Sequence, residues 1–190
     1  MNVTGGRILV ICYGNLCRSP MAEGLLRARL GEPWEVVSAG TNAIGGDAPS
    51  PMGVEAMRRE HGVDISEQRS TPLTVPVLSD ADHVFAMSVQ QAMLAAALGG
   101  RPDTVRLFGA FAPSLEQVDG SADPGGSRAN MFEISDPMGG DFEEYRECMA
   151  RLQRCTEKAA AWLESGADPD AGPPAVGSPR WRFQVGPSAS

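Results

Sequence analysis

Residues 7–23 read Arg-Ile-Leu-Val-Ile-Cys-Tyr-Gly-Asn-Leu-Cys-Arg-Ser-Pro-Met-Ala-Glu. The continuous apolar run over 8–11 is typical of a strand buried on both faces. A turn containing Gly and Asn follows over 12–19, and Pro20 stands where a first helical residue is expected. This stretch therefore predicts a strand, a tight turn and a helix in direct succession.

The same alternation continues along the chain. Further strands are expected over 34–38, 83–87 and 104–108, and helices over 51–61, 74–81 and 89–98. A long loop is predicted over 109–135. Asp141 is expected to cap the longest helix, because Glu144 three residues later completes a capping box. Strand–helix alternation with short connections predicts an α/β fold, a parallel sheet with helices on both faces.

Composition limits the classes of function. The chain has 190 residues, and 24 acidic against 16 basic residues give a net charge of −8. This charge argues against nucleic-acid binding and against binding to anionic membranes. No apolar run reaches the ~20 residues of a membrane helix, so a cytoplasmic protein with reduced thiols is expected. Residues 1–165 are predicted to form one domain, and the Gly-, Pro- and Ser-rich residues 166–190 a disordered tail.

The turn after the first strand carries the clearest chemical pattern. A loop at a helix N-terminus directs successive backbone N–H groups inward, which makes a site for phosphate. Arg18 adds a bidentate guanidinium, and the same donors stabilise a Cys12 thiolate. Gly14 and Asn15 tolerate the positive φ that such a loop needs. A lone Cys at a strand end is more often a small core residue, but the Gly-Asn turn and the Arg-Ser-Pro helix start favour a phosphate loop.

Three motifs carry a resemblance to a known family. Residues 12–23 closely resemble the signature of the low-molecular-weight protein tyrosine phosphatases, and Ser38-Ala-Gly-Thr41 resembles that family's second motif. Asp136-Pro137 is similar to its general-acid loop. The resemblance implies a four-stranded parallel sheet with the phosphate loop between the first strand and the first helix. It further implies hydrolysis of phosphotyrosine in a protein substrate through a phosphocysteine, with no metal and no cofactor.

The resemblance also assigns roles to individual residues. Cys12 is the expected nucleophile, Asp136 the general acid and then base, and Ser19 a hydrogen-bond donor to the Cys12 sulfur. Asn15 is expected to hold the loop in its strained shape. Asp123-Pro124 is a second Asp-Pro pair, but Asp136 is preferred because a helix start follows it. The phosphate-binding residues are expected to be Tyr13, Gly14, Asn15, Leu16, Cys17 and Arg18.

The other cysteines allow several interpretations. The resemblance implies that Cys17 can form a reversible disulfide with Cys12, while a small buried filler is equally consistent with the sequence. Cys148 and Cys155 lie seven residues apart on the last expected helix and are interpreted as buried core thiols. Without a Cys-x-x-Cys pattern or a nearby His, a zinc site is a poor fit.

The sequence indicates the substrate less clearly than it indicates the family. Ile44 and Met138 stand where phosphotyrosine-specific members often have aromatic residues, and Gln68 stands where many have a His bracing the loop Asn. The Asp-Pro-x-Gly-Gly pattern is similar to that of bacterial arginine phosphatases, which carry Thr at the position of Leu16. An apolar Leu16 favours a flat ring, so phosphotyrosine is the first choice and phosphoarginine the alternative.

Two further functions rank lower. An arsenate reductase on the same fold needs two more redox cysteines around residues 80–98, where this chain has none. A binding module that has lost catalysis is disfavoured because Cys12, Arg18 and Asp136 are all present. Nothing in the sequence indicates an oligomeric state.

Overall fold

The computed structural model describes residues 5–114 and 131–182. The sheet contains β1 (Arg7–Cys12), β2 (Glu35–Gly40), β3 (His83–Ala86) and β4 (Val105–Leu107). All neighbouring strands pair in parallel in the order β2-β1-β3-β4, which places β1 in the interior of the sheet. The predicted four-stranded parallel sheet is confirmed.

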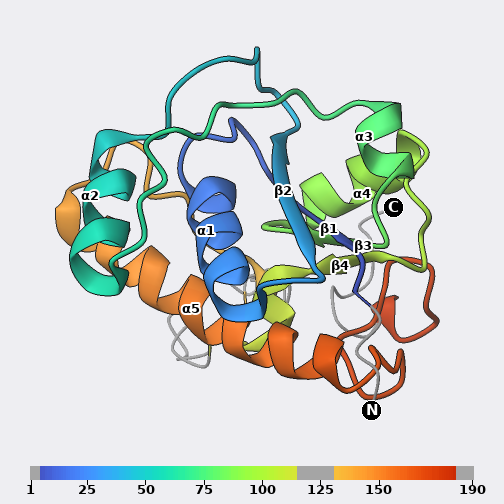
Figure 1. The fold of residues 1–190 in the computed structure, drawn as a ribbon. Coiled ribbons are helices and arrows are strands. Elements are labelled where there is room, and N and C mark those ends of the chain that lie inside the picture. The colour runs from blue at the N-terminus through green and yellow to red at the C-terminus, as the bar shows by residue number, and fades with distance from the viewer. Residues whose placement is uncertain (1–4, 115–130, 183–190) are drawn as a thin grey trace, which may run out of the picture.

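Helices cover both faces of this sheet (Figure 1). The chain forms α1 (Arg18–Leu30), α2 (Pro51–His61), α3 (Val75–Ser79), α4 (Val89–Ala97) and α5 (Phe142–Glu164), with a short 3-10 helix over Phe108–Phe111. Side chains from α1, α2 and α5 share one core cluster, and those from α3 and α4 share the other.

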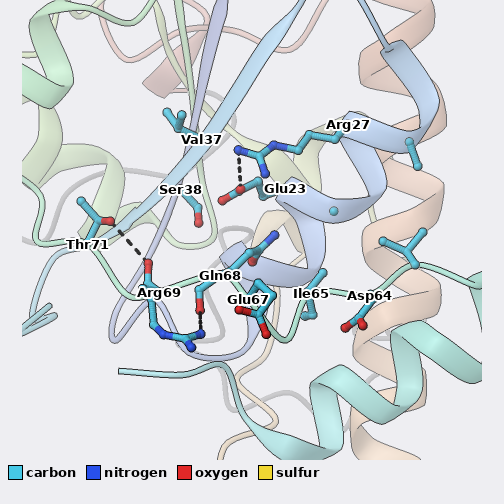
Figure 2. A pocket seen from close by; sticks show the side chains of 13 residues that line it. Glu23, Arg27, Val37, Ser38, Asp64, Ile65, Glu67, Gln68, Arg69 and Thr71 are labelled. Atoms are coloured by element: carbon cyan, nitrogen blue, oxygen red, sulfur yellow. Dashed lines mark hydrogen bonds and ion pairs between the residues drawn. The ribbon is translucent and has the colours of Figure 1, made fainter. Parts of the chain in front are cut away.

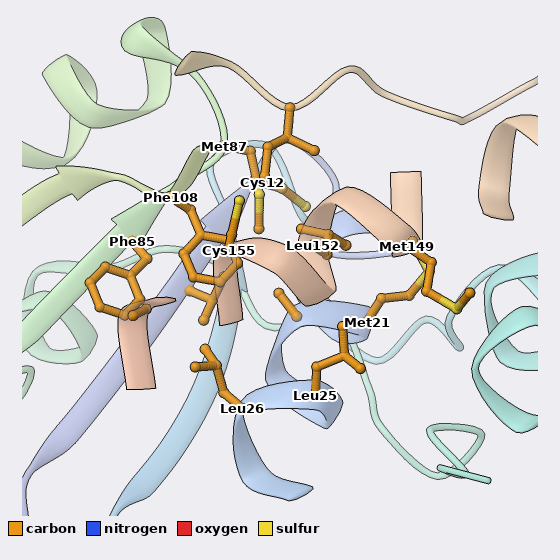
Figure 3. Close-up of a cluster of buried hydrophobic side chains, with 14 of the residues drawn as sticks. Cys12, Met21, Leu25, Leu26, Phe85, Met87, Phe108, Met149, Leu152 and Cys155 are labelled. Atoms are coloured by element: carbon orange, nitrogen blue, oxygen red, sulfur yellow. The ribbon is translucent and has the colours of Figure 1, made fainter. Parts of the chain in front are cut away.

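Strand β1 shows why both faces must be covered. Its side chains alternate, so that Ile8, Val10 and Cys12 enter the cluster of α1 and α5, while Leu9 and Ile11 enter the cluster of α3 and α4. All five are almost fully buried. Figure 3 shows the first cluster, where side chains of α1 and α5 meet the strands and Cys12 is among them. The nucleophile candidate therefore belongs to the packed core at the carboxyl end of β1.

The element boundaries differ from the expected ones in two places that concern the site. Helix α1 begins at Arg18, before Pro20, because the N–H of Met21 already bonds the Cys17 carbonyl (3.2 Å). Pro20 is tolerated in the first turn, where its missing N–H has no helical partner to lose. Strand β2 continues to Gly40, where a side chain would have no room, since an added Cβ would lie 2.7 Å from the Tyr13 carbonyl oxygen.

The start of α5 agrees with the sequence pattern. The Asp141 side chain accepts hydrogen bonds from the N–H groups of Glu143 (2.9 Å) and Glu144 (3.1 Å). In return, the Glu144 carboxylate accepts from the Asp141 N–H (2.8 Å). The predicted capping box is thus present, and it fixes the point where the Asp136 loop joins α5.

The described part of the expected disordered tail, residues 166–182, packs on the domain. The N–H of Val176 donates to the Val105 carbonyl of β4 (2.9 Å), and Trp181 is 6% exposed in the cluster of α3 and α4. This segment has no apolar periodicity, and its order comes from long-range contacts with β4. Residues 183–190 of this tail lie outside the described residues, as do 115–130 of the predicted long loop.

No helix in the described ranges is long and apolar enough to cross a membrane.

Replacing Trp181 with Ala should lower the free energy of unfolding by about 3–5 kcal/mol, because it removes a buried aromatic side chain and leaves a cavity. Urea unfolding of the full chain measures the change. The exposed neighbour Arg182, replaced with Ala, is the control and should shift stability by less than about 0.5 kcal/mol. Equal, small effects of both substitutions would contradict the packing of the tail.

Candidate active site

The loop between β1 and α1 surrounds the sulfur of Cys12. The backbone N–H of Asn15 donates to Cys12 Sγ (3.2 Å), and the Ser19 hydroxyl lies 3.0 Å from the same sulfur. Cys12 is 2% exposed, yet it lines an open cavity of about 310 Å³. The sulfur therefore faces both hydrogen-bond donors and a space large enough for a phosphoryl group.

Asn15 has the positive φ (55°) that the sequence suggested for this loop, whereas Gly14 is not among the described residues with positive φ. The side-chain amide of Asn15 is buried and fully bonded. Its Nδ2 group donates to the hydroxyls of Ser19 (2.8 Å) and Ser38 (2.8 Å), and its Oδ1 accepts from the Thr71 N–H (2.7 Å). Hydrogen bonds of one buried amide thus connect the loop to α1, to β2 and to the segment before α3.

Two of these partners, Ser38 and Thr71, line a second cavity of about 680 Å³ (Figure 2). Ser38 and the buried Glu23 both line it, and Glu23 forms an ion pair with Arg27 (2.9 Å). Burial raises the pKa of the Glu23 carboxyl, and hydrogen bonding from Ser38 and the charge of Arg27 oppose that rise.

Gln68 also lines this second cavity, but its buried Oε1 has no hydrogen-bond partner among the described residues. Asn15 is braced by other groups, the Ser38 hydroxyl and the Thr71 backbone. Ser38 and Thr71, and not Gln68, therefore brace the loop Asn.

The segment before α5 brings Asp136 to the phosphate loop. One Arg18 nitrogen donates to the Ile134 carbonyl oxygen (3.1 Å), and another is ion-paired with the Asp136 carboxylate. Arg18 is 6% exposed, while the Asp136 side chain is 42% exposed. The fold thus brings Asp136, from a distant part of the sequence, to Arg18 and to the cavity that Cys12 lines. Asp123, the other Asp-Pro candidate, lies outside the described residues.

Cys17 directs its side chain toward α5. Its sulfur lies 3.2 Å from the Tyr145 hydroxyl, which accepts a hydrogen bond from the Ser50 hydroxyl (2.8 Å). Burial raises the pKa of the Cys17 thiol, and the hydrogen bond with Tyr145 partly offsets this effect. Sequence reasoning did not find Tyr145 or Ser50, because their contacts with the loop join residues far apart in the chain.

The cavity above Cys12 has an apolar mouth. Tyr13, Ile44 and Met138 line it and are exposed, and Leu16 adds a partly buried side chain. These residues come from three separate segments: the phosphate loop, the loop after β2 and the segment around Asp136 before α5. Such a mouth can pack against a flat apolar group attached to a phosphate.

Within the described residues no group of three or more His, Cys, Asp and Glu side chains is arranged to hold a metal ion.

Comparison with known proteins identifies the class of this fold and site. The family model of the low molecular weight phosphotyrosine protein phosphatases matches residues 7–167, so the chain belongs to that family. It is 34% identical over 157 residues to a probable low molecular weight protein-tyrosine-phosphatase, EpsP, of Ralstonia solanacearum. That match covers 82% of this chain and 92% of the relative. The predicted family membership is confirmed.

Two other similarities concern the alternative functions. The YwlE arginine phosphatase from Geobacillus stearothermophilus superposes with a TM-score of 0.69 at 30% identity, covering 85% of this chain and 94% of that one. An arsenate reductase of Bacillus licheniformis is 46% identical, but over only 80 residues, 42% of this chain and 55% of the relative.

Replacing Ser38 with Ala should lower kcat for an aryl phosphate about tenfold, because it leaves an N–H of Asn15 without a partner. An unpaired buried donor costs about 1–3 kcal/mol, and about 1.4 kcal/mol is a factor of ten in rate. Steady-state kinetics with p-nitrophenyl phosphate measure the effect. Ser79→Ala on α3 is the matched control. A wild-type kcat in the Ser38 variant would show that the loop does not depend on this brace.

Proposed function

We propose that this chain is a protein tyrosine phosphatase that hydrolyses phosphotyrosine in cytoplasmic protein substrates through a phosphocysteine. One observation carries the proposal. The Cys12 thiol and the Asp136 carboxylate line one cavity. The Ser19 hydroxyl contacts the Cys12 sulfur, and the buried Arg18 guanidinium is ion-paired with Asp136. Family membership and the 34% identity to a probable tyrosine phosphatase support the same activity.

In the first step Cys12 attacks phosphorus, so that an S–P bond forms while the P–O bond to the tyrosine breaks. The N–H groups of the loop and the Arg18 guanidinium bind the nonbridging oxygens, and these fixed donors stabilise the charge of the transition state. Asp136 gives its proton to the leaving phenolic oxygen. The products of this step are a free tyrosine hydroxyl and a phosphocysteine.

In the second step a water attacks the phosphocysteine, Asp136 takes a proton from that water, and the S–P bond breaks. The Ser19 hydroxyl, 3.0 Å from the sulfur, can donate to the departing thiolate. Inorganic phosphate is released, and the original thiolate is restored. No step needs a metal ion or a cofactor.

The Arg18–Asp136 ion pair has a direct consequence for this cycle. A bound phosphate competes with Asp136 for Arg18, so substrate binding breaks this ion pair and leaves the Asp136 carboxyl free to face the leaving oxygen. Substrate binding and the position of the proposed acid are therefore coupled through one side chain.

Phosphotyrosine is preferred to phosphoarginine because of the cavity mouth. Leu16 and the exposed Tyr13, Ile44 and Met138 offer apolar contacts to a ring. Phosphoarginine hydrolysis is the second candidate, supported by the similarity to YwlE and by Met138-Gly139-Gly140.

Arsenate reduction is not favoured. Residues 80–98 contain no Cys, and burial raises the pKa of Cys148 to about 12 and of Cys155 to about 11. Thiols that stay protonated are poor partners for disulfide exchange. Their burial agrees with the interpretation as core thiols.

A reversible disulfide between Cys12 and Cys17 stays a prediction. Both residues line the same cavity, which supports it. Burial raises the pKa of the Cys17 thiol, and its sulfur contacts the Tyr145 hydroxyl, which opposes it.

Cys12→Ser should abolish turnover of aryl phosphates, because a serine hydroxyl is almost fully protonated near neutral pH.

Asp136→Asn should slow the hydrolysis of substrates with poor leaving groups most. General acid catalysis contributes roughly 10²–10⁴-fold to the rate and matters least when the leaving oxide is already stable. Rates over a series of substituted phenyl phosphates measure both, with a chelator added in a parallel series. Substantial activity of Cys12→Ser, loss of activity with the chelator, or a larger leaving-group effect in Asp123→Asn would contradict the assignment.

Leu16→Thr should shift the ratio of kcat/KM from phosphotyrosine toward phosphoarginine. An apolar wall leaves guanidinium N–H groups unpaired at about 1–3 kcal/mol each, enough for a ten- to hundredfold preference. Both substrates are measured on the wild type and the variant. A wild type that already favours phosphoarginine would overturn the tyrosine assignment.

A further inference from the structure

The catalytic cavity contains a carboxylate that the proposed mechanism does not use. Asp47, from the loop after β2, lines the same cavity as Cys12 and has an exposed side chain. Within the described ranges it forms no ion pair, unlike Asp136, which is paired with Arg18. Its charge is therefore available at the mouth of the site.

The backbone that carries Asp47 is held in place by the buried Ser70. The Asp47 N–H donates to the Ser70 hydroxyl (3.0 Å), and the Ser70 N–H donates to the Asp47 carbonyl (2.8 Å). The neighbouring Gly46 N–H donates to the Ser70 carbonyl (2.8 Å). Three hydrogen bonds to one buried residue keep the loop, and hence the carboxylate, at a defined place beside the cavity.

No cation offsets this carboxylate at the mouth. The charged side chains among the described residues lining the cavity, apart from the nucleophile, are Asp47 and Asp136, and no Lys or Arg lines it. Arg69, next to Ser70 in sequence, donates from one guanidinium nitrogen to the carbonyls of Ser66 (2.8 Å) and Gln68 (2.7 Å). Arg69 lines the second cavity (Figure 2). The positive charge of Arg18 is buried and paired with Asp136, so it does not offset Asp47.

The Asp47 carboxylate is thus the unpaired charge among the described residues that line this cavity, apart from the nucleophile. The proposed phosphate loop with Arg18 suits a phosphate dianion, the apolar mouth suits an aromatic ring, and Asp47 suits a cation. A substrate with a Lys or Arg beside the phosphorylated residue matches all three features. An acidic neighbour would instead face Asp47 and the net charge of −8.

We propose that Asp47 is a specificity residue that binds a cationic side chain next to the phosphorylated residue of the protein substrate. This inference rests on the proposed phosphatase function. It names a class of substrate, phosphorylated segments with a flanking Lys or Arg, and a residue outside the reacting centre that selects them.

The test uses phosphotyrosine peptides of one length that differ only in having Lys or Glu at a position flanking the phosphotyrosine, within about two residues on either side. The ratio of kcat/KM for the Lys and Glu peptides is measured for the full-length wild type, Asp47→Asn and Glu32→Gln. Glu32 is exposed and precedes β2 at the opposite end of the sheet, so its replacement changes the net charge equally.

The wild type should prefer the Lys peptide by about two- to fivefold in at least one flanking position, as expected of a solvent-exposed ion pair. The preference should shrink in about 1 M salt, where the Debye length falls to about 3 Å. Asp47→Asn should reduce the ratio toward one, and Glu32→Gln should keep it.

Equal rates for the two peptides in the wild type, or an undiminished preference in Asp47→Asn, would overturn the inference. Equal losses in both variants would assign the preference to net charge, which also overturns it. Hydrolysis of p-nitrophenyl phosphate by the wild type reports separately on the proposed function, since this substrate has no flanking charge.

Discussion

The buried amide of Asn15 is the constraint on which the site depends. Its three hydrogen bonds join the phosphate loop to α1, to β2 and to the segment before α3, so the loop shape is set by elements from three parts of the chain. The positive φ of Asn15 is unfavourable by itself, and these contacts stabilise it. Gly40 adds to this constraint, because only a residue without a Cβ leaves room for the loop to cross the end of β2.

Much of the fold could be predicted because its signals are local. Apolar runs identify the strands, and Asp141 with Glu144 identifies the start of α5. The packing of residues 166–182 could not be predicted, since Trp181 is buried by contacts with residues far earlier in the chain. The extension of β2 to Gly40 was missed for a related reason: its pairing with Cys12 depends on the neighbouring strand.

The residues of the candidate site also fall into those that local sequence indicates and those that it does not. Cys12, Arg18 and Ser19 lie within one short stretch, so their spacing alone indicated a phosphate loop. Asp136 was reached only through resemblance to a family. The brace by Ser38 and Thr71, the contact of Tyr145 with Cys17, and the placement of Asp47 at the cavity mouth arise from tertiary structure and left no local pattern. The residues of the phosphate loop are therefore indicated by local sequence, and the groups that brace the loop or line the cavity mouth are not.

The proposed mechanism requires that Cys12 carry the phosphoryl group during turnover. Asp136→Asn should slow attack of water on that intermediate, so acid quenching of this variant during turnover of p-nitrophenyl phosphate should trap it. Peptide mass spectrometry should then locate one phosphoryl group on Cys12. A quenched protein without phosphate, or with phosphate on Ser19 or Cys17 instead, would contradict the account.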